Sequence, residues 1–307
     1  MHVILFGANS ATLTDFVAAP INNNFISISR KRPNLLMHHY CVELSRTIPS
    51  EEVDNIVTYL LQFDTEFIFI LSAWCGTMRS TVGQYTSLYG KSNQTIIDNV
   101  LQICKKVIPL QVIFFSSAGA LYPFNSPLAW NESHPVCLNS SYAIQKYFAE
   151  IKLAKVCTKY DIKLCIMRIS CCYGFNSLNP AQGIINHWIY SLLCKKPIYL
   201  LVDLDSVLNF ISYSQFSKCL REAITEQLFG IYNIGTSESV SLRIIYEQIS
   251  VFFPLIASSI VESSSIKRIN YLDVTKFFDK TSVLLSSSVR DDVASIYEAA
   301  RRHLGLS

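Results

Sequence analysis

Short, fully apolar runs alternate along the chain with longer stretches in which apolar residues recur every three or four positions. The short runs predict buried β-strands, and the longer stretches predict amphipathic helices. We expect strands near residues 2–6, 25–29, 40–44, 67–71, 111–115 and 163–168, and helices near 51–63, 91–106 and 142–159. Because strands and helices alternate, the pattern predicts an α/β fold with a doubly wound parallel sheet.

After residue 174 the pattern becomes looser. It predicts a helix over 180–195, a strand over 197–201, a helix over 241–252 and a charged terminal helix over 288–303. Residues 67–71 are the most hydrophobic run, but they fall far short of the ~20 residues that a membrane span requires. We therefore expect a buried central strand there and no membrane span.

Composition places the chain among globular proteins. Apolar residues make up 50% and charged residues 16% of the 307 positions, enough chain for one large or two modest domains. A net charge of +3 gives no reason to expect a nucleic-acid partner. The ten cysteines are scattered without metal-ligand spacing, so we expect no metal, reduced thiols and a cytoplasmic location. The apolar start lacks a basic segment and is interpreted as a strand, not a signal peptide.

Tyr142 and Lys146 are four residues apart, which on a helix places both side chains on one face. A lysine ammonium there can stabilise the phenolate and lower a pKa that is otherwise near 10. The tyrosine could then exchange a proton with a sugar hydroxyl near neutral pH. In a chain with 16 tyrosines the spacing also arises by chance, and a plain helix-surface contact is the alternative.

Three segments occur in a fixed order: 116–119 (SSAG), 142–146 (YAIQK) and 168–174 (RISCCYG). The first lies where the strand 111–115 ends, and ligands bind at the carboxyl ends of strands in such sheets. With these segments the chain resembles the extended short-chain dehydrogenase/reductase superfamily, in particular the NAD-dependent epimerase/dehydratase enzymes that modify nucleotide sugars. Asn93, Glu132, Glu150 and the segment 230–242 fit the same family, so the resemblance covers nearly the whole chain.

The resemblance implies a Rossmann-type sheet followed by a smaller C-terminal substrate-binding domain. Residues 1–174 would bind the dinucleotide, with a return to the sheet near 205–235, and residues 175–307 would mainly bind substrate. Tyr142 would be the acid/base, and Lys146 would lower its pKa and hold the nicotinamide ribose. Ser117 would bridge Tyr142 to the sugar oxygen, with Ser116 as its alternate; an alignment through Tyr122 instead puts Ala118 at that position. The substrate-binding residues that the resemblance implies are Ser117, Tyr142, Cys171 and Asn176.

The loop after the first strand is a degenerate dinucleotide loop. It reads GANSATL over residues 7–13 and keeps only Gly7 of the family's three glycines. Ser10 could still allow a close approach of the backbone to a pyrophosphate, whereas Leu13 would push the following helix off the strand. The alternative is a plain turn without cofactor. The cofactor-binding residues that the resemblance implies are Gly7, Asn9, Ser10, Arg30, Glu43, Ser72, Ala73, Asn93, Tyr142 and Lys146.

A basic triplet, Arg30-Lys31-Arg32, follows the second strand, where an NAD-binding fold would carry an acid. A guanidinium can stack on adenine and bind a 2′-phosphate, so the triplet favours NADP over NAD. A solvated basic loop is the alternative. By the resemblance, Glu43 would contact adenine.

Two departures from the family narrow the chemistry. Residues 118–121 carry no carboxylate, whereas dehydratases use an Asp-Glu pair there, so we expect no dehydratase activity. Leu208 stands where the family has an arginine that grips the nucleotide diphosphate. We expect an NAD(P)-dependent epimerase or ketoreductase acting on a nucleotide sugar in polysaccharide biosynthesis, with a homodimer left open. A catalytically eroded member that binds a nucleotide or a partner is the alternative.

Overall fold

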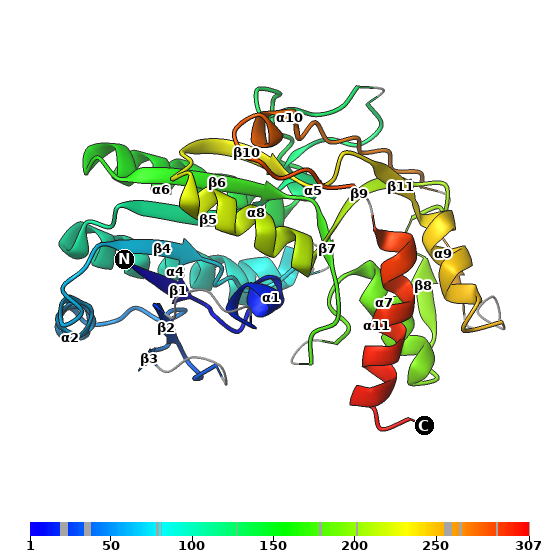
Figure 1. The fold of residues 1–307 in the computed structure, drawn as a ribbon, viewed down its shortest axis with the longest axis horizontal. Helices are drawn as coiled ribbons and strands as arrows, with labels where there is room; N and C mark the ends of the chain where they lie inside the picture. The colour runs from blue at the N-terminus through cyan, green and yellow to red at the C-terminus, as the bar shows by residue number, and fades with distance from the viewer. Residues whose placement is uncertain are drawn as a thin grey trace.

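A parallel sheet of seven strands organises the larger part of the molecule (Figure 1). The computed structural model describes residues 1–18, 24–33, 38–77, 80, 82–126, 128–177, 180–200, 202–254, 260–263, 266–286 and 288–306. The strand order is β10-β6-β5-β4-β1-β2-β3, which is the doubly wound order of Rossmann folds. The strands are β1 (His2–Phe6), β2 (Phe25–Ser29), β3 (His38–Cys41), β4 (Phe67–Leu71), β5 (Gln111–Ser117), β6 (Lys163–Ile169) and β10 (Gly230–Ile234). The predicted fold class is confirmed.

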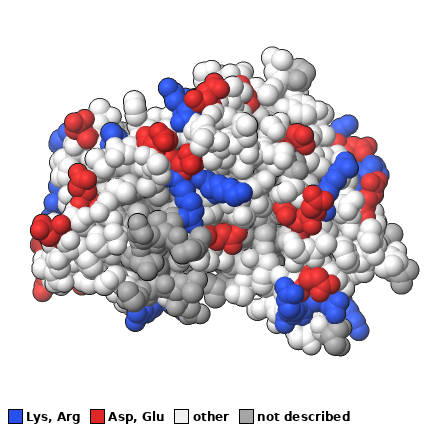
Figure 2. Space-filling view, viewed as in Figure 1, with Lys and Arg blue, Asp and Glu red and all other residues white. Residues whose placement is uncertain are grey.

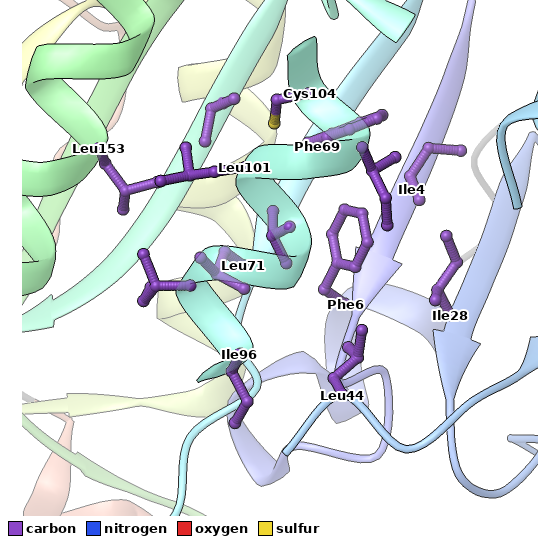
Figure 3. Packing of buried hydrophobic residues seen from close by; sticks show 14 of the residues in the cluster. Ile4, Phe6, Ile28, Leu44, Phe69, Leu71, Ile96, Leu101, Cys104 and Leu153 are labelled. Atoms are coloured by element: carbon purple, nitrogen blue, oxygen red, sulfur yellow. The ribbon is translucent and has the colours of Figure 1, made fainter. Parts of the chain in front are cut away.

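Helices cover both faces of this sheet. One face packs on α2 (Ser50–Leu61), α4 (Gly90–Val107) and α6 (Ser141–Lys159), and the other on α1 (Thr14–Ala18) and α8 (Tyr213–Thr225). A 3-10 turn, η1 (Ala11–Leu13), precedes α1. The central strands are apolar throughout because alternate side chains enter opposite cores. Phe6 and Phe69 face α4 in the core shown in Figure 3, whereas Leu5 and Ile70 face the other side.

The C-terminal part has a core of its own, which includes Trp188 and Ile296. Its strands form a three-stranded sheet and a parallel pair, and its helices lie beyond the carboxyl ends of the large sheet (Figure 1). The elements are β7 (Cys171–Tyr173), β9 (Val207–Ser212) and β11 (Ser239–Ser241), β8 (Ile198–Leu200) and β12 (Ile260–Ser263), with α7 (Ile184–Leu193), α9 (Leu242–Ser250) and α11 (Val289–His303). Short helices complete the chain: α3 (Val82–Gln84), the π-helix η2 (Tyr85–Tyr89), α5 (Ala118–Leu121) and α10 (Thr275–Phe278).

The predicted elements occur, with small differences at their ends. The strand predicted at 40–44 is β3, at His38–Cys41, and the helix predicted at 180–195 is α7, at Ile184–Leu193. Residue 201, the end of the strand predicted at 197–201, lies outside the described residues. Within the described part of the chain, no helix is long and apolar enough to cross a membrane. All ten cysteines are free thiols.

Acidic and basic side chains intermingle over the face of the molecule shown in Figure 2. Neither sign forms one continuous field across that face, in keeping with the small net charge of +3. The charges on this face therefore do not mark a binding site, and particular side chains have to identify it.

Candidate active site

The side chains of Tyr142 and Ser117 lie beside each other at the carboxyl end of β5, close enough for Ser117 to lower the pKa of the phenol in part. Ser117 is the last residue of β5, and Tyr142 lies in the first turn of α6. The start of α6 is fixed by Ser140, whose side chain accepts a hydrogen bond from the Ala143 backbone N–H at 3.1 Å. The N-cap thus places the phenol at the strand end where ligands bind in this class of sheet.

Lys146 follows one turn later and is buried, with 5% of its surface exposed. Its Nζ donates a hydrogen bond to the Phe115 carbonyl at 2.7 Å and lies 3.8 Å from the centre of the Trp74 ring. Burial lowers the pKa of Lys146 to about 7, and the nearby negative charge of Glu150 acts in the opposite direction. The ammonium is therefore easily deprotonated for a lysine.

The effect of Lys146 on the pKa of Tyr142 stays a prediction. Burial is the largest influence on Tyr142 and raises its pKa well above the usual value, as does the Cys172 thiol nearby. The Ser117 side chain lowers the pKa only in part, and the Lys146 Nζ is 5.8 Å from the Tyr142 ring centre. Tyr142 is consequently a neutral phenol at pH 7 and is suited to donating a proton.

Ser116 and Ser117, the two alternates for the bridging hydroxyl, have different partners. Ser116 is 5% exposed, and its hydroxyl donates to the Glu150 carboxylate, away from Tyr142. Neighbouring residues of a strand point to opposite faces, which explains the difference. Ala118, the third position considered, has no hydroxyl and is buried. The placement therefore favours Ser117 as the hydroxyl beside the reacting oxygen.

A buried polar network supports this edge of the sheet. The Glu150 carboxylate accepts hydrogen bonds from Arg168 Nε at 3.2 Å and Nη2 at 2.8 Å. Arg168 Nη1 donates to the Tyr122 hydroxyl at 3.0 Å, which in turn donates to Asn233 Oδ1 at 2.9 Å. The Asn233 backbone N–H donates to Glu132 at 2.7 Å, so both glutamates singled out from the sequence belong to one network. The role of Arg168 was missed, although an arginine inside an apolar strand was a visible signal.

Gly7 lies where β1 and β4 come closest. Its φ is +90°, and a Cβ at this position would lie 2.6 Å from the Ala73 backbone nitrogen. The Ser72 hydroxyl donates to the Gly7 carbonyl at 2.9 Å and to the Phe6 carbonyl at 3.1 Å. Three of the predicted cofactor residues, Gly7, Ser72 and Ala73, thus form one contact between two strand ends.

The rest of the loop departs from a dinucleotide loop. Ser10 has an extended backbone, φ −64° and ψ 137°, and its hydroxyl pairs with that of Thr12 at 2.9 Å. Leu13 is fully buried in the core that also holds Leu5 and Phe16. A 3-10 turn stands where the first turn of the phosphate-facing helix is expected. The side chain that replaces the third glycine has become part of the core.

The basic triplet and Glu43 meet at the ends of β2 and β3. Arg30 Nε lies 3.2 Å from the Glu43 carboxylate, and the arginine side chain is 72% exposed. Burial opposes ionisation of Glu43, but hydrogen bonds from Ser45 and the charge of Arg30 lower its pKa below the usual value. The Asn9 side chain donates to the Lys31 carbonyl at 3.0 Å, which joins this loop to the glycine loop.

Asn93 and Asn176 both bond to other parts of the protein. Asn93 Oδ1 accepts from the Cys75 N–H at 2.7 Å, and its Nδ2 donates to the Cys75 carbonyl at 3.0 Å and to Gln145 at 2.8 Å. It therefore ties the loop after β4 to α6 instead of presenting its amide to a ligand. Asn176, predicted to contact substrate, is buried and donates to Thr14 at 2.5 Å. Cys171 is half-buried on β7, and burial raises its pKa to about 11.

Comparison with known proteins decides the family. The sequence model of the NAD dependent epimerase/dehydratase family matches residues 32–235, more than half of the chain. The chain belongs to this family. It is similar in fold to UDP-glucuronic acid 4-epimerase from Bacillus cereus, solved with UDP-glucuronic acid and NAD, at 16% identity and a TM-score of 0.82 over 98% of this chain and 99% of that one. UDP-glucose 4-epimerase from Thermus thermophilus, solved with NAD, gives 18% identity and a TM-score of 0.79 over 97% and 100%.

Curated relatives match over a shorter stretch. A Methanocaldococcus jannaschii protein named as a UDP-glucose 4-epimerase is 26% identical over 150 residues, 48% of this chain and 49% of the relative. The Escherichia coli dTDP-4-dehydro-6-deoxyglucose reductase is 26% identical over 141 residues, 45% and 44% of the two chains. The chain thus spans about half the length of the curated relatives that it matches.

Within the family, two departures have structural substitutes. Leu208 packs against the C-terminal core, and Asn209 beside it donates to the Thr236 carbonyl at 2.8 Å and accepts from the Thr236 N–H at 3.1 Å. The carboxylate-free segment 118–121 forms the short helix α5, whose Ala118, Ala120 and Leu121 are buried. Among the described residues, no group of three or more His, Cys, Asp or Glu side chains is placed to hold a metal ion.

Proposed function

We propose that the protein is an NAD(P)-dependent enzyme that transfers a hydride at a sugar carbon of a nucleotide sugar, as an epimerase or a ketoreductase. The placement of Ser117 beside the Tyr142 phenol, with the buried Lys146 ammonium one turn further along α6, is the observation that carries the proposal. Membership of the epimerase/dehydratase family supports it. So does the likeness in fold to epimerases solved with NAD and UDP-sugars.

A nicotinamide cofactor would supply or accept the hydride. Tyr142, kept neutral by burial, would donate its proton to the carbonyl oxygen of a keto-sugar, and Ser117 would hold that oxygen by its hydroxyl. Solvent would then return a proton to the Tyr142 oxygen. A neutral phenol is the form that donates a proton, as the reduction half of either reaction requires.

The proposed cofactor is NADP, with NAD as the alternative. Arg30 is 72% exposed, and a 2′-phosphate could take the place of Glu43 on its guanidinium. Gly7, Ser72 and Ala73 would lie beneath the dinucleotide, because they occupy the carboxyl ends of two central strands. Lys146 would hold the nicotinamide ribose beside Tyr142.

A binding module without catalysis is the second candidate. The loop at residues 7–13 favours this hypothesis, because Leu13 lies in the core and residues 11–13 form a 3-10 turn. Leu208 favours it as well. Against it stands the energetic cost of burying Lys146, which a protein without catalytic work has no need to bear.

Identification of any nucleotide bound to the purified protein would distinguish the enzyme from the binding module. We expect heat denaturation to release NADP(H) or NAD(H), identified by its mass and by absorbance at 340 nm after reduction. If none is released, the intrinsic fluorescence of the protein should change on titration with NADPH or NADH. A tightly held cofactor would favour an epimerase, whereas a cofactor that exchanges with solution would favour a ketoreductase. No binding of either dinucleotide would favour the binding module.

Further parts of the proposal concern partners, domains and location. Residues 1–174 would serve the dinucleotide and residues 175–307 mainly the nucleotide sugar. The ten free thiols support a reducing cytoplasm as the location of the protein.

Ile144, Phe148 and Ile151 form an exposed apolar stripe along α6 and support a homodimer. Sedimentation of the wild type and Phe148→Asp tests it: a wild-type dimer that Phe148→Asp converts to a monomer is expected, and a wild-type monomer contradicts it.

A further inference from the structure

Three aromatic rings surround the Lys146 ammonium. Its Nζ lies 3.8 Å from the ring centre of Trp74, 4.9 Å from that of Phe114 and 5.8 Å from that of Tyr142. The rings come from the loop after β4, from β5 and from α6. We call this set of Trp74, Phe114 and Tyr142 the aromatic cage.

A buried ammonium with three N–H donors requires compensation for the water it has lost. Among the described residues, the Phe115 carbonyl is the one hydrogen-bond acceptor that Lys146 reaches. Glu150, one turn further along α6, is the carboxylate whose charge acts on Lys146, but both of its oxygens accept hydrogen bonds from Arg168 and one also accepts from Ser116. Most of the negative charge of Glu150 is thus already balanced, and the ring faces are left to stabilise the cation.

Trp74 is the cage member best placed to do so. Its ring is the nearest, and the indole face attracts cations more strongly than the rings of Phe or Tyr. Its backbone neighbour Cys75 is fixed by Asn93 on both the N–H and the carbonyl, and its ring packs against Phe114 at 6.0 Å. The buried indole N–H has no hydrogen-bond partner among the described residues, so no hydrogen bond to them explains why a tryptophan stands here. The ring face does.

We propose that Trp74 is a positioning residue: its indole face holds the charged ammonium of Lys146 at the carboxyl ends of β4 and β5, beside Tyr142. Its value for catalysis rests on the proposed function, but the holding of the ammonium is a property of the ligand-free protein. The titratable groups around Lys146 are Tyr142 and Glu150 on α6, with Arg168 beyond Glu150 on β6; the β4 loop and β5 present rings and a carbonyl. Loss of the indole face removes stabilisation from the charged form alone, so Lys146 should lose its proton at lower pH.

The titration of Lys146 can be followed by NMR in protein labelled with ¹³C at lysine Cε, with the signal assigned by its absence from Lys146→Met. We expect Trp74→Leu, which keeps an apolar side chain at the site, to lower the titration midpoint by about one pH unit. Trp74→Phe should recover part of that shift. The control is Trp188→Phe, which removes an indole from the separate C-terminal core and should leave the midpoint unchanged.

An unchanged midpoint in folded Trp74→Leu would overturn the proposal, as would an equal shift in Trp188→Phe. Titration of NADPH and NADH then separates the two proposals. Trp74→Leu should weaken dinucleotide binding more at pH 8 than at pH 6, and a loss equal at both values contradicts a role through the lysine charge. If wild type binds neither dinucleotide, the proposed function fails, whereas the NMR midpoint still decides the role of Trp74.

Discussion

The two oxygens of the Glu150 carboxylate accept hydrogen bonds from Nε and Nη2 of Arg168, at 3.2 and 2.8 Å, and both side chains are almost fully buried. This pair joins α6, which carries Tyr142, to β6, the strand between β5 and β10. A bidentate pair of this kind has a defined geometry and tolerates little sliding of the helix along the strand. It thereby fixes the position of Tyr142 relative to Ser117.

Removal of one partner should be costly because the other charge stays buried without compensation. We expect Glu150→Ala to lower the free energy of unfolding by roughly 3–5 kcal/mol, measured by urea denaturation. The control is Asp205→Asn, which breaks the exposed pair that Asp205 forms with Arg243 at 2.7 Å and should leave the unfolding midpoint where it was. Equal effects of the two substitutions would contradict a structural role for the buried pair.

Tyr142→Phe should leave the fold intact and suppress turnover by roughly 10²–10⁴-fold, the range for a positioned acid or base. The substitution removes only the hydroxyl that lies beside Ser117. Tyr147→Phe removes a hydroxyl from the same helix and is the matched control, with near-normal turnover expected. Full activity of folded Tyr142→Phe on the true substrate would remove the acid/base assignment.

Lys146 should make stability depend on pH. Its pKa is about 7 in the folded protein against 10.5 as the usual value, so between these limits the unfolded chain binds more protons. Stability should therefore rise as pH increases from 7 towards 10.5, and the cost of the buried charge is fully present below pH 7. Lys146→Met should raise the free energy of unfolding by a few kcal/mol at pH 6, on the order expected from such a shift, and by little at pH 10. Urea denaturation at the two pH values measures this, and an equal gain at both would contradict it.

Arg30 and Glu43 form a pair whose two members should affect cofactor choice in opposite directions. Arg30→Ala should weaken NADPH binding and leave NADH binding little changed, because the guanidinium would bind the 2′-phosphate. Glu43→Gln should strengthen NADPH binding, because it removes the carboxylate that now lies 3.2 Å from Arg30. Fluorescence titration of both dinucleotides measures these affinities, and a preference for NADH in wild type would overturn the assignment of NADP.

Ser10→Gly tests the degenerate loop. The glycine removes a side chain from the approach to a pyrophosphate, so calorimetry should find tighter dinucleotide binding than in wild type. Leu13 is the less suitable site, since an alanine there would leave a cavity costing roughly 2–5 kcal/mol. Tight binding in wild type that Ser10→Gly leaves unchanged would mean that the loop is a working variant.

The strands that the sequence predicted residue by residue, such as β1 and β4, are those buried on both faces, because only burial on both faces makes a continuous apolar run. β3 was placed two residues late. It is an edge strand that starts with His38 and His39, whose polar side chains carry no period-two signal. Local pattern identifies buried elements well and half-exposed edges poorly.

In the candidate site, the pairing of Tyr142 with Ser117 follows from sequence spacing and the end of a strand. The raised pKa of Tyr142 and the contact of Trp74 with Lys146 depend on how deeply three elements bury one another, which no local spacing encodes. Asn176 was assigned to substrate but bonds with Thr14, which lies 162 residues earlier in the chain. Such a contact is a product of tertiary packing alone.

The fold requires a glycine at position 7 whether or not a ligand binds. A methyl group in its place would press on the Ala73 backbone at 2.6 Å and force the ends of β1 and β4 apart. A family member that had lost catalysis would therefore still keep this glycine, whereas the two later glycines of the loop, replaced here by Ser10 and Leu13, could be lost. Gly7 is thus retained for the packing of the fold, and a loss of activity would be recognised from the loop positions after it.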